Sequence, residues 1–238
     1  MVEFYCMIKI EFQPSGFLLV NKPSGPTSHD IIDELRQLTG IRKIGHAGTL
    51  DPFASGLLIV AVGRPATKEI SRFVKMDKEY IAEILLGQES DTYDRTGNIK
   101  INSGVKIIGQ EKIKKTLKKF VGKQKQLPPM YSAKKVGGRK LYELARRGET
   151  IERTPSVIEI FELKLLGYNW PKLKIKIRCS SGTYIRSLAH DLGQALGCGA
   201  LTSELERTAI NGYNLTEANN LQTLQKNWQT YLINRPVA

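Results

Sequence analysis

The alternation of apolar and polar residues along the chain predicts a sheet built from short, buried strands. Two nearly continuous apolar runs, Phe17–Asn21 and Leu57–Val62, are typical of strands covered on both faces, and Lys78–Leu86 is a third candidate strand. Residues Lys172–Cys179 alternate apolar with cationic side chains, which predicts one buried and one solvated face. Because a second strand with mixed faces, Val157–Leu165, directly precedes it, we expect a mixed, mainly antiparallel sheet in an α/β (α+β) fold.

Helical spacing lies between these strands. Four apolar residues recur at helical spacing between Ser28 and Gly40, so we expect a helix that Ser28 caps and Gly40 ends. A second helix is expected from a cap at Thr183 to about Leu196. Shorter or more polar helices are expected at residues 66–74, 110–121, 141–148 and 221–232. We therefore expect helices to flank the central sheet.

A glycine-rich loop leads into the second apolar run and contains a carboxylate. The stretch G-H-A-G-T-L-D-P-F-A-S-G begins at Gly45, and Pro52 stiffens the turn that presents Asp51. Catalytic groups are commonly placed on loops that a rigid strand holds. The spacing also fits an aspartate that closes its own turn by accepting backbone N–H groups, so both interpretations stay open.

Composition points to a polyanionic partner. Lys and Arg number 36 against 23 Asp and Glu, a net charge of +13, which favours nucleic acid first and an anionic membrane surface second. A generally basic proteome is the alternative explanation. No apolar stretch reaches the ~18 residues of a membrane span, and the N-terminus does not resemble a signal peptide. The 3 cysteines form no C-x-x-C pair, so we expect no disulfide framework, no zinc site, and a reducing, cytoplasmic location.

Basic and aromatic residues are interleaved in the segment Gln126–Arg153. It combines 7 Lys and Arg residues with Tyr131, Tyr142 and a Gly-Gly pair, and Lys125 lies just outside it. Phosphate neutralisation combined with stacking is what a nucleic-acid clamp needs, and an ordinary surface loop is the alternative. The lysines of the helix expected at 110–121 are more simply explained as solvated surface charges.

Two further segments contain charged residues that need partners. The motif S-S-G-T-Y-I-R-S-L puts Arg186 in the first turn of a helix, where the helix dipole disfavours a cation unless an anion answers it. This predicts a partner carboxylate or phosphate. In the polar, turn-rich segment Gly87–Gly97, Asp91 and Asp94 could bind a cation, but two carboxylates on a polar loop are more often solvated.

Six motifs occur in the order that is seen in one enzyme family. They are N-K-P-S-G-P-T-S (Asn21–Ser28), G-H-A-G-T-L-D-P-F-A-S-G (Gly45–Gly56), the strand start Lys78–Tyr80, P-P-M-Y-S-A (Pro128–Ala133), L-Y-E-L-A-R-R-G (Leu141–Gly148) and S-S-G-T-Y-I-R-S-L (Ser180–Leu188). Together they resemble the TruB family of bacterial tRNA pseudouridine synthases over residues 17–213. One departure, G-R-P-A-T-K in place of the family's usual G-x-A-T-K, alters only a strand-to-helix turn.

The resemblance implies a pseudouridine synthase fold with Gln126–Arg153 as its inserted thumb loop, and tRNA pseudouridine(55) synthase activity, an isomerase reaction. Members of the family break the uracil N1–C1′ bond, turn the base within the site and join C5 to C1′. They use no metal, nucleotide or redox cofactor, so none is expected. For the essential aspartate, attack at C1′, attack at uracil C6 and elimination through a glycal all stay open.

The resemblance also implies roles for residues at matching positions. Asp51 matches the aspartate nucleophile, Arg186 is the candidate cation that keeps it ionised, and Tyr80 matches the tyrosine that packs on the uracil and helps to remove the C5 proton. His46 matches the histidine that enters the T-loop, and Lys22 is expected to brace the catalytic loop. The residues expected to bind substrate are His46, Tyr80, Tyr184, Leu205 and Lys22.

The resemblance implies one large unit with a short extension. Residues 1–213 are expected to form the catalytic domain, with the thumb at 126–153. Residues 214–238 are expected to form a short helical extension in place of the complete RNA-binding (PUA) domain that family members commonly contain. The expected partner is the T stem-loop of tRNA; no membrane or metal is expected, and a monomer is the default.

Two other functions fit the same residues. An RNA chaperone that unfolds and refolds the tRNA elbow would need the basic clamp but no chemistry. A synthase of the same superfamily that acts on ribosomal RNA, or with a guide RNA, is the second alternative, which the thumb motifs and the short chain disfavour.

Overall fold

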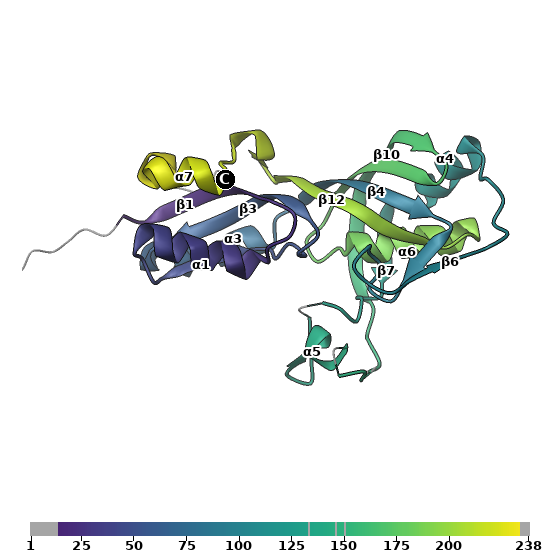
Figure 1. Ribbon diagram of the computed structural model, residues 1–238, viewed down its shortest axis with the longest axis horizontal. Coiled ribbons are helices and arrows are strands. Elements are labelled where there is room, and N and C mark those ends of the chain that lie inside the picture. The colour runs from purple at the N-terminus through teal and green to yellow at the C-terminus, as the bar shows by residue number, and fades with distance from the viewer. Residues whose placement is uncertain (1–13, 133, 146, 150, 234–238) are drawn as a thin grey trace, which may run out of the picture.

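The computed structural model describes residues 14–132, 134–145, 147–149 and 151–233. These residues form an elongated molecule in which one twisted sheet runs through both ends, while a small lobe around α5 (Leu141–Ala145) projects from the body (Figure 1). Strand β12 (Ala200–Ile210) passes between the N-terminal half, with β1, β3 and α1, and the half that contains β4, β10 and α6 (Figure 1).

The described residues form a central sheet of nine strands. Their order is β1 (Gly16–Lys22), β3 (Ser55–Val62), β12, β4 (Lys78–Leu86), β11 (Lys172–Cys179), β10 (Ser156–Asn169) and β7 (Gly122–Gln126), with β2 (Ile44–Ala47) beside β3 and β13 (Tyr213–Asn214) beside β12. All neighbours pair antiparallel except β3 and β12, which are parallel. The predicted fold class, a mixed and mainly antiparallel sheet flanked by helices, is confirmed.

Helices cover this sheet and divide its apolar side chains into three clusters. The helices are α1 (Ser28–Thr39), α2 (Arg64–Glu69), α3 (Ser71–Val74), α4 (Gln110–Lys119), α5, α6 (Ile185–Leu196) and α7 (Leu221–Asn227), with 3-10 turns at Leu215–Glu217 and Trp228–Tyr231. Alternate residues of β1 and β3 pack against α1 and α7 on one face and against Phe73 and Tyr213 on the other. The largest cluster joins α4 and α6 to β4, β10 and β11.

Two small hairpins complete the described structure. Strands β5 (Gln88–Ser90) and β6 (Ile99–Ile101) form one, and β8 (Lys135–Val136) and β9 (Arg139–Lys140) form the other, within the projecting lobe. The described residues contain no helix that is long and apolar enough to cross a membrane.

Most predicted elements are confirmed, and the differences lie at their ends. The first helix is capped by Thr27, whose side chain accepts from the Asp30 N–H; the prediction of Ser28 as the cap is wrong. Thr183 does not cap α6, because its hydroxyl donates to the Ser180 carbonyl instead. The helix expected at 66–74 is divided into α2 and α3. Strand β12 was not predicted at all.

One edge of β3 is shared by two strands, and this places the aspartate loop. Strand β2 pairs with the second half of β3, through Ile59–Val62, while β12 pairs only with Ser55 and Gly56. The loop between β2 and β3 therefore emerges where β12 joins the sheet. Gly56 is required at this seam, because a Cβ atom there would lie 2.4 Å from the Arg207 carbonyl oxygen and its φ is +106°.

We expect Gly56→Ala to destabilise the fold strongly, since the new methyl group meets backbone and the residue has a left-handed φ. A loss of about 3 kcal/mol or more in the free energy of unfolding is expected, measured by urea denaturation. Gly104→Ala is the matched control, because Gly104 also has a positive φ of +83° but a Cβ atom added there would meet no described atom within 4 Å. Equal losses in both variants would show that the close approach of β12 contributes nothing.

Candidate active site

The turn after β1 holds the aspartate loop from beneath. Lys22 is fully buried, and its ammonium donates to the carbonyls of Pro23 and Pro26 at 2.8 Å and of Pro52 at 3.4 Å. The Ser28 hydroxyl donates to the Leu50 carbonyl and accepts from the Leu50 N–H. The two residues on either side of Asp51 are thus bound to the turn. Burial lowers the pKa of Lys22 to about 8, partly offset by the charge of Asp51.

Asp51 is paired with Arg186, the cation in the first turn of α6. The Arg186 Nε donates to Asp51 Oδ2 at 2.9 Å and Nη2 donates to Oδ1 at 3.0 Å, a bidentate arrangement. The Arg186 side chain is 4% exposed, whereas that of Asp51 is 35% exposed and can be reached from solvent. Asp51 does not close its own turn with its side chain; only its backbone carbonyl does so, by accepting from the Ala54 N–H.

Asp94 is the second anion that answers Arg186, and the expectation that it is solvated is wrong. Its Oδ2 lies 3.3 Å from Arg186 Nη1, and its side chain is 4% exposed. Its Oδ1 accepts from the Thr92 hydroxyl and from the N–H and hydroxyl of Thr96. The residues around Asp94 form a compact turn, and it is the distant Arg186 that makes burial of the carboxylate favourable. Asp91, by contrast, is exposed.

The Arg186 guanidinium makes hydrogen bonds to three segments of the chain and an ion pair to Asp94. Besides the two carboxylates, Nη1 donates to the Thr92 carbonyl and Nη2 to the Tyr131 carbonyl, each at 2.8 Å. Four of the five N–H groups of the guanidinium thus donate hydrogen bonds, and Nη1 also faces Asp94 in an ion pair. The arginine is consequently fixed in position and orientation by the aspartate loop, the loop after β5 and the base of the projecting lobe.

The electrostatic surroundings of Asp51 act in opposite directions. Burial raises the pKa of its carboxyl group, Arg186 lowers it, and the nearby charge of Asp94 raises it. The net direction is upward, so the carboxylate is a stronger base and a better nucleophile than an exposed aspartate. Such a group is suited to attack on an electron-poor carbon beside it.

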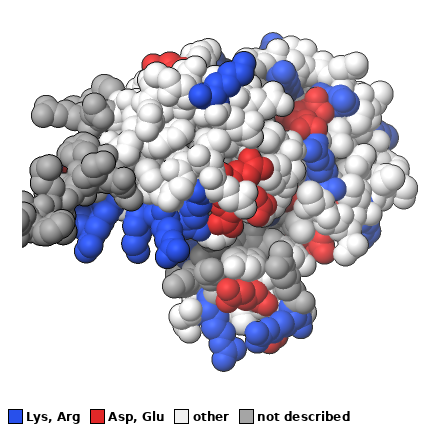
Figure 2. Space-filling view, turned by 60° about the vertical axis from the view of Figure 1, so that its left-hand side comes forward, with Lys and Arg blue, Asp and Glu red and all other residues white. Residues whose placement is uncertain are grey.

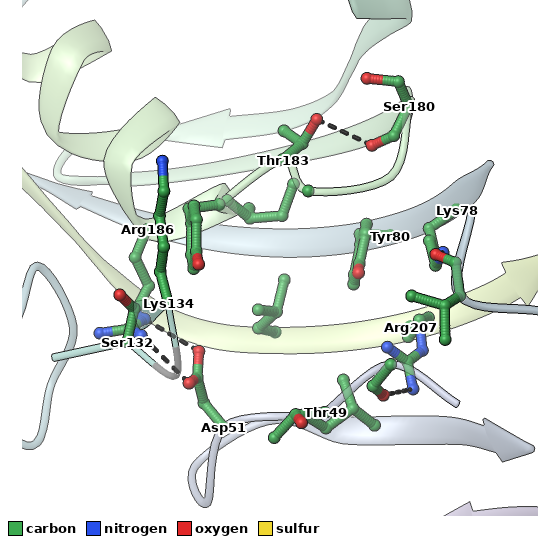
Figure 3. Close-up of a pocket in the computed structure, with 17 residues that line it drawn as sticks. Thr49, Asp51, Lys78, Tyr80, Ser132, Lys134, Ser180, Thr183, Arg186 and Arg207 are labelled. Atoms are coloured by element: carbon green, nitrogen blue, oxygen red, sulfur yellow. Dashed lines mark hydrogen bonds and ion pairs between the residues drawn. The ribbon is translucent and has the colours of Figure 1, made fainter. Parts of the chain in front are cut away.

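A cavity of about 410 Å³ opens beside Asp51, within the roughly 300–1,000 Å³ of small-molecule sites. Figure 3 shows Asp51 and Arg186 at one side of it and Arg207 and Lys78 at the other, with Tyr80 between them. Tyr184 and Leu205 also line it. Burial raises the pKa values of the Tyr80 and Tyr184 hydroxyls, so both are neutral at ordinary pH. The cavity offers a carboxylate beside flat, apolar walls.

Two of the expected substrate-binding residues lie outside this cavity. Lys22 lies beneath the loop and supports it, as described above. His46 lies on β2, two residues before Gly48, and its Nδ1 atom has no hydrogen-bond partner among the described residues. Burial and the nearby charge of Arg207 lower the pKa of His46, so its ring is neutral at neutral pH.

The projecting lobe is attached directly to the start of α6. The Gln126 side-chain amide donates to the Tyr184 carbonyl at 2.9 Å and accepts from the Tyr184 N–H at 2.8 Å. The Ser187 hydroxyl donates to the Leu127 carbonyl, and Arg153 crosses the base of the lobe to the Pro128 carbonyl. The position of the lobe is therefore linked to that of Arg186.

Cations gather on exposed surface near the site. Figure 2 shows a row of Lys and Arg side chains along one edge of the molecule and others on the projecting lobe. The N-terminal half exposes Arg42, Lys43, Arg64, Lys68, Arg72 and Lys75, and the lobe exposes Arg139 and Arg147. Arg153 bonds within the lobe instead, and Lys134 donates to the Ser156 hydroxyl at the start of β10. The side chains of Lys135, Lys140 and Arg146, and Cys6, lie outside the described residues.

Sequence reasoning missed Asp94 and Arg207 as parts of this site. The spacing T-x-D-x-T around Asp94 is a signal for a carboxylate that accepts from its own loop. Arg207 had no comparable signal, because its strand was not predicted. The described residues contain no group of three or more His, Cys, Asp and Glu that could hold a metal ion.

Family models match most of the chain. Residues 36–185 match the model described as TruB family pseudouridylate synthase (N terminal domain), and residues 186–235 match that of the tRNA pseudouridylate synthase B C-terminal domain. The tRNA pseudouridine synthase B of Protochlamydia amoebophila is 51% identical over 198 residues, 83% of this chain and 75% of that protein. The Chlamydia muridarum protein of the same name is 45% identical over 202 residues, 85% of this chain and 83% of its own.

Two of the solved structures that align with this chain are parts of larger complexes. A chain of a Cbf5-Nop10-Gar1 complex aligns with a TM-score of 0.71 and 28% identity over 90% of this chain, which spans 54% of that chain. A chain of an H/ACA RNP bound to a substrate RNA containing 2′-deoxyuridine aligns with a TM-score of 0.67 and 27% identity over 90% of this chain, which spans 53% of that one.

Proposed function

The chain belongs to the TruB family of pseudouridylate synthases, and on this premise we propose that it converts the T-loop uridine of tRNA to pseudouridine with Asp51 as nucleophile. The observation that supports this most is the bidentate Asp51–Arg186 pair at the edge of a cavity with aromatic walls. An ionised carboxylate beside a sugar carbon suits cleavage of a glycosidic bond, since positive charge develops there in the transition state.

Asp51 and Tyr80 act on different parts of the target nucleotide. Asp51 acts on the ribose side when the N1–C1′ bond breaks, and its exposed oxygen atoms face the cavity. Tyr80 packs on the uracil ring while the base turns to present C5 to C1′. Arg186 keeps Asp51 ionised in a buried setting and holds its two oxygens in a fixed plane. Leu205 and Tyr184 complete the walls that exclude water.

The target base must leave the RNA stack to reach this cavity, which costs a few kcal/mol. We propose that His46 and Tyr80 make the contacts that compensate for this free-energy cost. The neutral ring of His46, two residues before the cavity-lining Gly48, enters the T-loop as a wedge in place of the base, and Tyr80 supplies the stacking surface inside. Lys22 acts on this step only by bracing the loop.

The projecting lobe, residues 126–153, is the thumb that closes over the T stem-loop. Its exposed arginines and those of the N-terminal half offer cations to backbone phosphates. We propose residues 1–213 as the catalytic domain and 214–238 as a C-terminal extension. In support, the Ile233 N–H donates to the Phe17 carbonyl, and Leu224 is buried against β1 and α1.

The experiment that tests this function uses an unmodified T stem-loop hairpin. The protein alone, without added cofactor, is expected to convert the uridine at the T-loop position to pseudouridine, mapped by chemical labelling and reverse transcription. A hairpin in which that uridine is replaced by cytidine is the control and should remain unlabelled. Conversion of uridines in a ribosomal RNA hairpin but not in the T-loop would overturn the assignment of substrate.

A further inference from the structure

Arg207 on β12 is a fully buried cation that bonds both ends of the aspartate loop. Its side chain is among the largest that are fully buried, with a residue exposure of 1%. Its Nε donates to the Leu57 carbonyl at 2.7 Å and its Nη2 to the Gly48 carbonyl at 2.8 Å. The guanidinium therefore connects the segment before Asp51 to the strand after it, on the cavity side opposite Arg186 (Figure 3).

Unlike Arg186, Arg207 has no ion-pair partner among the described carboxylates. Arg186 has two such partners, at 2.9 and 3.3 Å. Burying a cation without an anion is costly, because carbonyl groups replace water only in part. A second buried cation, Lys78, lies nearby and donates to the carbonyls of Val74 and Met76; burial, with Arg207 adding to it, lowers its pKa to about 8. Two cations, Lys78 and Arg207, thus line this end of the cavity, and the Asp77 carboxylate beside Lys78 is not among the lining residues.

Tyr80 is the group that Arg207 faces. The two residues are direct partners in the antiparallel pairing of β4 with β12, which brings their side chains together on one face of the sheet. The pairing is irregular between Arg207 and Ala209, a bulge of the kind that redirects side chains beside active sites. Both side chains line the cavity, and the nearby guanidinium charge acts to lower the pKa of the tyrosine hydroxyl.

Other groups also act on the Tyr80 hydroxyl. Burial raises its pKa, Arg207 lowers it, and the Cys179 thiol of β11 and the Asp51 carboxylate raise it further. The Cys179 thiol, whose pKa burial raises to about 12, is neutral at ordinary pH. Lys78 lies on the same strand as Tyr80, and Arg186 and Lys134 line the same cavity. Among these groups it is Arg207, the cross-strand partner of Tyr80, that acts most strongly to favour the ionised form of the phenol.

We propose that Arg207 is a positioning residue that stabilises the phenolate of Tyr80 while this oxygen removes the proton from uracil C5. The inference rests on the proposed function and adds a named group to it. Once C5 is bonded to C1′, the C5–H bond breaks and the phenolate takes the proton. The electron pair of that bond forms the C5=C6 double bond, the electrons of the C6=N1 bond return to N1, and N1 takes up a proton. No oxidant, reductant or co-reactant is needed.

The test is a cycle of Arg207→Gln, Tyr80→Phe and the double variant, each followed through single turnovers of the T stem-loop hairpin as a function of pH. Arg207→Gln is expected to move the alkaline rise of the rate upward by about one pH unit, because the phenolate has lost its cation. In the Tyr80→Phe background the same change should produce no further shift. Arg207→Lys, which keeps the charge, is expected to give a smaller shift and serves if the glutamine variant does not fold.

A uniform loss of rate at every pH, with no shift, would show that Arg207 only supports the loop and would overturn the inference. A shift that persists without the Tyr80 hydroxyl would overturn it as well, because the titrating group would then be another one. Failure of the proposed function is distinguishable from both, since the unchanged protein would then convert no hairpin at any pH.

Discussion

Replacing Asp51 by asparagine is expected to lower the rate of pseudouridine formation by at least ~10⁴-fold, the scale on which loss of a nucleophile acts. Asparagine has nearly the same shape but has no negative charge and cannot act as the nucleophile. Affinity for the T stem-loop should change by less than about threefold, because the exposed cations and the thumb are untouched. Single-turnover release of the C5 proton and filter binding measure the two quantities.

Asp33→Asn is the matched control, since Asp33 is an exposed carboxylate on α1 whose contacts are to neighbouring residues of the same helix. It should leave both quantities unchanged. The comparison separates an enzyme from an RNA chaperone that needs the same surface but no chemistry. Loss of binding together with activity in Asp51→Asn would mean that the carboxylate supports the fold of the loop and is not the nucleophile.

Replacing Arg186 by glutamine is expected to lower the rate at pH 7 by at least ~100-fold and to make it depend on pH. Without the guanidinium, burial and Asp94 both raise the pKa of Asp51, and the main group that lowers it is gone. Less of the carboxylate is then ionised at a given pH, so the rate should recover as the pH rises. Single-turnover rates between pH 6 and 9 measure this recovery, which should be steeper than any rise that the unchanged protein shows over the same range through Tyr80.

The same substitution also tests the buried network as a source of stability. Removing one member of a buried ion pair costs about 3–5 kcal/mol, because the carboxylates left behind are unpaired. Urea denaturation of Arg186→Gln should show a loss of that size, and Arg178→Gln, in which an exposed arginine on β11 is changed, should show almost none. A rate that stays low at every pH, in a protein that is folded, would argue that Arg186 does not set the ionisation of Asp51.

Predictions from sequence succeeded where the signal is local. Strands β1, β3 and β11 have apolar patterns that few other structures could satisfy, and the structure shows them buried as these patterns require. The Asp51 loop was also recognisable, because glycine and proline fix backbone geometry within a few residues. The position of this loop beside the first turn of α6 depends on tertiary contacts, which no local pattern reveals. The helix-dipole argument for Arg186 predicted that its partner is negatively charged but not which residue it is.

Predictions failed where a distant contact decides the outcome. Strand β12 contains Glu204, Glu206 and Arg207, and two irregularities interrupt its pairing with β4, so no alternating pattern could be read. Asp94 lies in a stretch whose polarity indicates solvent, and nothing within that stretch reveals the arginine that buries it. At the start of α1, Thr27 and Ser28 could each cap the helix. The Ser28 hydroxyl instead forms two hydrogen bonds with the backbone of Leu50, and Thr27 is the cap.

The hydrogen bond from Arg186 to the Tyr131 carbonyl has a consequence for how the lobe and the site are connected. Because Arg186 Nη2 donates both to Asp51 and to the Tyr131 carbonyl, a displacement of the lobe at Tyr131 leaves a buried donor without an acceptor. Displacing the lobe at Tyr131 therefore also disturbs the hydrogen bonds that hold Asp51. The nitrogen atom that orients one oxygen of Asp51 is thus also a point at which the lobe is attached to the body.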